Sequence, residues 1–207
     1  MFAERLIGIF ISVPLFAAAP TVTFSKSFPG SVPAYEVITV QQDGSASYNE
    51  STDKDNAENF KLEPAAVTTI FDYAEKLNHF KGTLESGLKV ANMGAKTLRW
   101  ENGAEASEAK FNYSQDDSVA KLVDLMEALG ESEREYLMLK RVIRYDKLGV
   151  NDSMLRIHML YNRKRLYGAA QYLPLLDRVA KDETLVHIAR ERAAQVAELM
   201  RGQTVQK

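Results

Sequence analysis

Residues 34–48, AYEVITVQQDGSASY, contain two stretches typical of β-strands around a tight turn. Residues 34–40 are rich in β-branched and aromatic side chains, and residues 45–48 provide the returning strand. Between them, Gln41-Gln42-Asp43-Gly44 supplies the glycine that a tight turn needs for a positive φ. The sequence therefore predicts a β-hairpin here.

A second hairpin is predicted farther along the chain, where residues 96–101 and 109–113 flank the turn Asn102-Gly103. Residues 21–33 are rich in Ser, Pro and Gly, so we expect an extended segment leading into the first hairpin. Residues 49–59 are polar and acidic without periodicity and are expected to form a surface loop.

Helical patterns follow both hairpins. Pro64 suits the first turn of a helix, and Asp116 or Asp117 is expected to cap a second helix that ends at Gly130. Ser132 and Glu135 have the spacing of a capping box, which predicts that a new helix starts there.

From there to residue 207 the chain reads as short helices, with Asp152 and Asp182 as two of the expected N-caps. The predicted fold class is α+β: a small antiparallel sheet of hairpins with one or two helices, followed by an all-helical C-terminal array. We expect an α+β domain over residues 20–130 and a helical domain over residues 131–207.

The charges of the two predicted domains differ in sign. Residues 20–130 hold 10 Lys and Arg against 17 Asp and Glu, whereas residues 131–207 hold 15 against 10. This distribution fits two structural units that attract each other, and it equally fits a basic half that meets an anionic partner.

The N-terminus has the layout of a secretory signal peptide. Arg5 precedes an apolar run at residues 6–16, LIGIFISVPLF, which is followed by three alanines ending at Ala19. The run is shorter than the roughly 20 residues that span a bilayer. We therefore predict a signal peptide over residues 1–19, export to the periplasm or outside the cell, and no transmembrane segment in the mature chain.

Residues 30–48 resemble a bacterial domain-of-unknown-function family. Gly30-Ser31-Val32-Pro33-Ala34-Tyr35, then Asp43-Gly44 and Tyr48, are similar to that family's Gly-x-Cys-Pro-x-Tyr strand, Asp-Gly turn and returning strand. The chain has Phe28 and Val32 where the family's cysteines would lie. The resemblance implies the hairpin and supplies neither a catalytic residue nor a redox role.

No catalytic or metal-binding pattern is recognisable in the sequence. There is no cysteine, no Gly-x-Ser-x-Gly turn and no phosphate-binding glycine loop. His79, His158 and His187 are far apart, and His187 with Glu191 gives two ligands at helical spacing where zinc takes three or four. We therefore expect no metal and no cofactor.

Basic side chains near tyrosines are the one candidate for a binding site, and they fall in two groups. They are Lys140, Arg141, Arg144, Arg163, Lys164 and Arg165. Such helices bind anionic partners, although docking against the acidic half or ordinary solvation accounts for the same charges. Because export is predicted, we expect another envelope protein or an anionic polymer as the partner and no nucleic acid; the oligomeric state stays open.

These observations favour an exported, non-enzymatic binding or interaction module of the cell envelope. The alternative is an exported hydrolase with a carboxylate or serine site of an unfamiliar kind. That alternative requires a pocket in which acidic residues with shifted pKa values converge with Arg99, Trp100 or His79.

Overall fold

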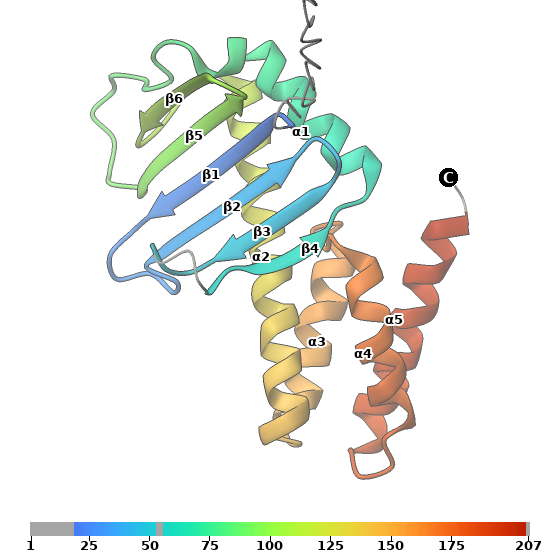
Figure 1. The fold of residues 1–207 in the computed structure, drawn as a ribbon. Helices are drawn as coiled ribbons and strands as arrows, with labels where there is room; N and C mark the ends of the chain where they lie inside the picture. The colour runs from blue at the N-terminus through green and yellow to red at the C-terminus, as the bar shows by residue number, and fades with distance from the viewer. Residues whose placement is uncertain (1–18, 53–55, 206–207) are drawn as a thin grey trace, which may run out of the picture.

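The computed structural model describes residues 19–52 and 56–205, so the signal peptide predicted at residues 1–19 lies outside it except for Ala19. The described residues form a six-stranded sheet and five helices, with one additional short turn (Figure 1). The elements are β1 (Thr21–Ser27), β2 (Tyr35–Gln41), β3 (Ser45–Asn49), β4 (Glu58–Lys61), α1 (Pro64–Lys76), η2 (Asn78–Phe80), β5 (Ala95–Asn102), β6 (Glu105–Phe111), α2 (Asp117–Tyr145), α3 (Gly149–Asn162), α4 (Ala169–Lys181) and α5 (His187–Val205).

The strands lie in the order β4-β3-β2-β1-β5-β6, and every neighbouring pair is antiparallel. Both predicted hairpins are confirmed, as β2–β3 and β5–β6. In the first, Gly44 has φ +86°, the positive value that the turn requires. The expectation of a lead-in at residues 21–33 is wrong for residues 21–27, because β1 pairs with β2 and β5 in the middle of the sheet.

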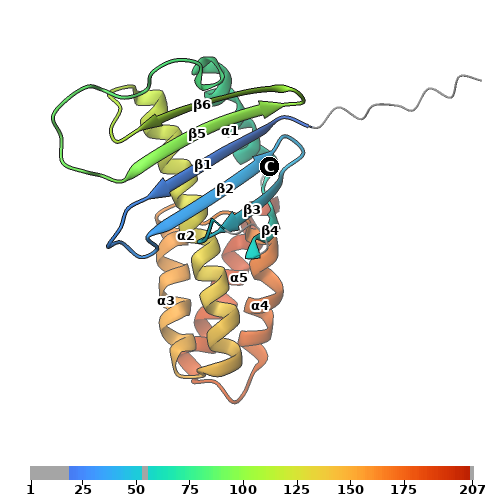
Figure 2. The ribbon, with the colours of Figure 1, turned by 60° about the vertical axis from the view of Figure 1, so that its left-hand side comes forward.

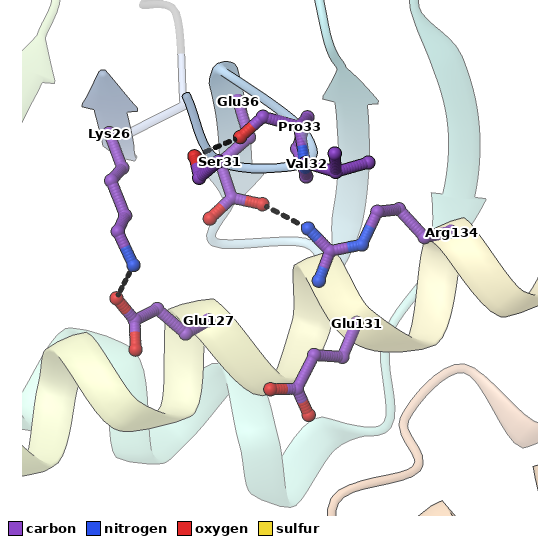
Figure 3. A pocket seen from close by; sticks show the side chains of 8 residues that line it. All are labelled: Lys26, Ser31, Val32, Pro33, Glu36, Glu127, Glu131 and Arg134. Carbon is purple, nitrogen blue, oxygen red and sulfur yellow. Dashed lines mark hydrogen bonds and ion pairs between the residues drawn. The ribbon is translucent and has the colours of Figure 1, made fainter. Parts of the chain in front are cut away.

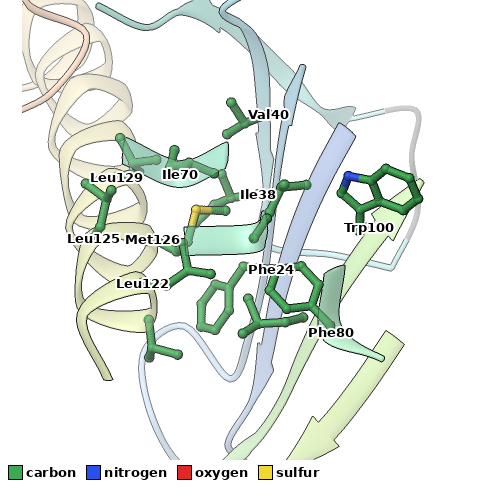
Figure 4. Packing of buried hydrophobic residues seen from close by; sticks show 14 of the residues in the cluster. Phe24, Ile38, Val40, Ile70, Phe80, Trp100, Leu122, Leu125, Met126 and Leu129 are labelled. Carbon is green, nitrogen blue, oxygen red and sulfur yellow. The ribbon is translucent and has the colours of Figure 1, made fainter. Parts of the chain in front are cut away.

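One face of the sheet is covered by α1 and the first half of α2. Phe24 and Ile38 project from the strands toward Leu122 and Met126 of α2, and all four are fully buried (Figure 4). Along β1 and β2 the buried positions alternate with partly exposed ones, as expected when only one side of a sheet is covered. This apolar layer is the first of two cores.

The helix α2 runs unbroken through the predicted domain boundary, so the predicted helix end at Gly130 is wrong. A Cβ at Gly130 would lie 2.8 Å from Glu36 Oε2 and 3.3 Å from Ile38 Cδ1. The glycine therefore permits a close approach between α2 and β2. The capping box predicted at Ser132 is also wrong, because the Ser132 hydroxyl bonds to the carbonyls of Ala128 and Arg165.

The second half of α2 packs with α3, α4 and α5 around a separate apolar core (Figure 2). The predicted caps at Asp152 and Asp182 are wrong: Asp152 lies within α3, and α5 begins at His187, after the turn that Asp182 stabilises. The predicted fold class, α+β with a helical C-terminal array, is confirmed. In the described part of the chain, no helix has both the length and the apolar character needed to cross a bilayer.

Candidate binding surfaces

A polar hollow lies between α2 and the loop that joins β1 to β2 (Figure 3). Its volume is about 140 Å³, well below the roughly 300–1,000 Å³ of pockets that enclose small ligands. Its lining consists of Lys26, Ser31, Val32, Pro33, Glu36, Glu127, Glu131 and Arg134.

Every carboxylate of the hollow has a cationic partner. Lys26 Nζ lies 2.7 Å from Glu127, and Arg134 Nη1 lies 3.2 Å from Glu36. Glu131 is paired with Arg165, a residue that does not line the hollow and whose Nε donates to the carboxylate at 2.8 Å. Burial raises the pKa of Glu36, while the nearby Arg134 and Lys26 oppose that rise. The arrangement is a set of ion pairs and leaves no carboxylate free to act as a general base.

The residues that the hydrolase alternative requires do not line this hollow. Trp100 is buried on the helix-covered face of the sheet, where its ring stacks on His79 with centroids 4.2 Å apart. Arg99 points to the opposite face and binds Glu101 and Glu108 at 2.6 and 3.3 Å. Among the described residues, no group of three or more His, Asp and Glu side chains is arranged to hold a metal ion.

The six basic residues predicted as a binding site do not form one patch. Lys140, Arg141 and Arg144 lie on the second half of α2, whereas Arg163 to Arg165 follow α3, which runs back toward the sheet. Arg165 binds Asp124 and Glu131 on α2. Glu131 and Arg141 are ten residues apart, or about 15 Å along the helix axis.

Two of these cations pair with the acidic half of the chain. Lys140 Nζ lies 3.3 Å from Glu58 of β4, and Arg165 Nη1 lies 2.5 Å from Asp124. Together with the pair Arg134–Glu36, these contacts join residues 20–130 to residues 131–207. Part of the opposite net charge of the two halves is therefore used in ion pairs between them. Arg141, Arg144, Arg163 and Lys164 are exposed and form no ion pair with a described carboxylate.

A buried polar junction lies between α2, α4 and the segment after β4. The Glu63 carboxylate accepts hydrogen bonds from the backbone N–H groups of Gly168 and Ala169, at 3.2 and 2.8 Å, at the start of α4. Glu133 is only 1% exposed, and its Oε1 accepts a hydrogen bond from Gln171 Nε2. Its Oε2 has no hydrogen-bond partner among the described residues. Burial raises the pKa of Glu133 to about 7.

The sheet face that points away from α1 and α2 has no described helix over it (Figures 1 and 2). On β1, β2 and β3 its outward positions carry no charge and are dominated by hydroxyl groups, and we call this surface the hydroxyl face. Its serine and threonine side chains, all partly exposed, are Thr21, Thr23, Ser25, Ser27, Thr39, Ser45 and Ser47.

The register of the strands brings these hydroxyls into rows. Thr23 lies opposite Thr39, which lies opposite Ser47, and the hydroxyls of Thr23 and Thr39 are 3.0 Å apart. Sequence reasoning missed this surface, although β1 carries its signal: Thr, Thr, Ser and Ser recur at every second position from residue 21 to residue 27. Alternation of this kind places all four side chains on one face.

Comparisons with known proteins found no matching protein-family model, no matching curated protein and no matching solved structure.

Proposed function

We propose that the protein is an exported, non-enzymatic binding module of the cell envelope and that the hydroxyl face is its binding surface. The observation that carries this proposal is a sheet face, uncovered by any described helix, whose central strands β1, β2 and β3 carry mainly short, uncharged polar side chains. A sheet offers a rigid platform on which binding groups keep their spacing, about 4.8 Å between strands and 6.7 Å along them.

The chemistry of the hydroxyl face favours a neutral, hydroxyl-rich polymer such as an envelope glycan. Each Ser or Thr hydroxyl both donates and accepts hydrogen bonds, as sugar hydroxyls do. Hydroxyls in rows therefore offer matched contacts to a chain of sugars. A polyanion would find no cation at the outward positions of β1, β2 and β3.

The hydrolase alternative receives less support. The acidic groups of the hollow are each held by Lys26, Arg134 or Arg165, and the volume of the hollow is small for a substrate site.

The proposal is tested by electrophoresis through native gels with and without dissolved polysaccharide. We expect a neutral polymer, dextran or a β-glucan, to retard the wild-type chain and alginate to retard it less. A charge placed on the hydroxyl face, as in Thr23→Lys with Ser47→Lys, removes this retardation. The matched control Thr68→Lys with Thr69→Lys adds the same charge on exposed positions of α1 and keeps it.

Because added charge changes mobility by itself, each variant is compared with its own mobility in the polymer-free gel. Equal retardation of the two double variants would assign binding to another surface. Absence of retardation by every neutral polymer tested would contradict a glycan partner.

A further inference from the structure

Four large apolar side chains are exposed at the end of the helical half that lies farthest from the sheet. Tyr145 and Leu148 lie at the connection from α2 to α3, and they are 72% and 79% exposed. Val186 and Ile188 lie at the connection from α4 to α5, at 43% and 52%. We call these four residues the apolar tip.

The two connections lie side by side. Both are at the same end of the helices in two views, and Lys147 Nζ of the first donates to Thr184 Oγ1 of the second at 2.7 Å (Figures 1 and 2). Single exposed apolar residues are ordinary on protein surfaces, but four gathered at one end are characteristic of a contact surface.

The turns that present the apolar tip are internally stabilised. Asp146 Oδ1 accepts a hydrogen bond from the N–H of Gly149 at 3.0 Å, and Asp182 Oδ1 accepts from the N–H and hydroxyl of Thr184 at 3.0 and 2.6 Å. The bond from Gly149 encloses Leu148, and the bonds from Thr184 order the turn just before Val186. The apolar tip is therefore presented by ordered turns in the described structure.

Exposed cations flank the apolar tip on its α2 side. Arg141, Arg144 and Lys147 lie there with two acids: Asp146, whose carboxylate serves the turn to Gly149, and Asp152, in the first turn of α3. The Arg144 guanidinium lies over the Tyr145 ring, 5.2 Å from its centroid. On the α4–α5 side Lys181 stands against Asp182 and Glu183, so the cationic character is concentrated beside Tyr145 and Leu148.

We propose that the apolar tip inserts into the interfacial layer of a membrane that contains anionic lipids. Aliphatic and aromatic side chains enter the boundary between headgroups and acyl chains, while adjacent Arg and Lys bind the anionic headgroups. This surface is separate from the hydroxyl face, and the inference does not depend on the function proposed there.

A second copy of the chain fits this surface less well. A stable protein interface uses about 20–30 residues on each side, whereas the apolar tip consists of four residues on two short connections. A small, protruding end with exposed apolar side chains and an arginine beside Tyr145 is better matched to a deformable anionic surface than to a rigid partner.

The test is co-sedimentation of the full chain with vesicles, either of phosphatidylcholine alone or of a three-to-one mixture with phosphatidylglycerol. Leu148→Ser is expected to weaken binding to the mixed vesicles about tenfold. Arg144→Glu is expected to weaken it at least about fivefold and to remove the preference for the anionic lipid. The matched controls are Leu88→Ser, at an exposed position in the loop before β5, and Lys121→Glu on the sheet-side half of α2.

All variants have the same residues 1–19 and are prepared in the same way, so differences between the tip variants and their controls report on the apolar tip alone. Equal vesicle binding by Leu148→Ser and Leu88→Ser would overturn the proposal. A second outcome would also overturn it: the wild type fails to bind vesicles and is instead a dimer by light scattering, and Leu148→Ser dissociates that dimer. This outcome would assign the apolar tip to contact with a second copy of the chain.

Discussion

Replacing Glu133 by glutamine tests the physical account of the junction between α2 and α4. The carboxylate is buried, and one of its oxygens has no described hydrogen-bond partner. Burial raises its pKa to about 7, the hydrogen bond from Gln171 lowers it, and the charges of Glu58 and Lys140 act in opposite directions. The folded protein therefore favours the neutral acid.

The expected pH dependence follows from this direction. In the unfolded chain the ordinary pKa of the group is 4.5, so Glu133 loses its proton more easily there than in the folded protein. Its contribution to stability is most favourable below about pH 4.5 and is lost as the pH rises through about 7. A shift of this size corresponds to about 3 kcal/mol over the full range, of which about 2 kcal/mol falls between pH 5 and pH 8.

Urea unfolding of the wild type and of Glu133→Gln at pH 5 and pH 8 measures this contribution. The quantity of interest is the variant's gain in unfolding free energy at pH 8 minus its gain at pH 5, expected at about +2 kcal/mol. Taking this difference removes the cost of an amide proton without a partner, because that cost is the same at both pH values. It also removes the contribution of every group that titrates in the same way in the wild type and the variant. The control Glu75→Gln removes a carboxylate from an exposed position of α1.

A difference near zero for Glu133→Gln would refute the reasoning, because it would mean that the carboxylate is hydrated or paired in solution. A negative difference would mean that the ionised form is the one that stabilises the junction.

Four further predictions concern packing, helix propensity, capping and export. Gly130→Val should lower the unfolding free energy by about 1–3 kcal/mol in a urea titration, because its side chain would clash with Glu36 and Ile38. Gly202→Ala, in the exposed last part of α5 with nothing within 4 Å of the added carbon, should instead raise it by about 0.5–1 kcal/mol. Glu63→Ala should cost about 1–2 kcal/mol by the same measurement, because it leaves two N–H groups of α4 without their acceptor; a loss as small as that of Glu75→Ala would contradict the capping role. Expression in a bacterial host should yield a periplasmic or secreted product shortened by roughly 17–23 residues, whereas an intact mass equal to the full chain in the cytoplasm would contradict the predicted signal.

The parts of the fold that the sequence predicted are those determined by local chemistry. The turn at Asp43-Gly44, the proline at the start of α1 and the cap at Asp116 act within a few residues of themselves. Asp116 accepts hydrogen bonds from the N–H groups of Ser118 and Val119, as its position predicted. Each such signal was readable without knowing which elements become neighbours.

The wrong predictions of helix ends and caps fall at residues whose side chains or close approach involve elements distant in the sequence. Gly130 and the Ser132–Glu135 pair have the pattern of a helix end and a new start, but Gly130 makes room for β2. Ser132 bonds to the carbonyl of Arg165, and Glu135 binds Arg156 of α3. Nothing in the local sequence distinguishes these uses from caps.

The candidate surfaces show the same limit. The two basic groups were predicted to form one binding site, but the chain reverses between α2 and α3 and places them at different levels along the helices. The apolar tip arises from two connections about forty residues apart, so no sequence window contains it. Glu133 had a readable signal, because it continues the stripe of Leu122, Met126 and Leu129 along α2 and is therefore an acid at a buried position.

The unbroken α2 relates the two proposed surfaces to each other. Its 29 residues span about 43 Å, with the sheet on its first half and the apolar tip at its C-terminal end. The pairs Glu36–Arg134 and Glu58–Lys140 tie the sheet to the second half of this helix, and Glu63 ties it to α4. A membrane bound at the apolar tip would therefore hold the hydroxyl face at a fixed distance from the lipid.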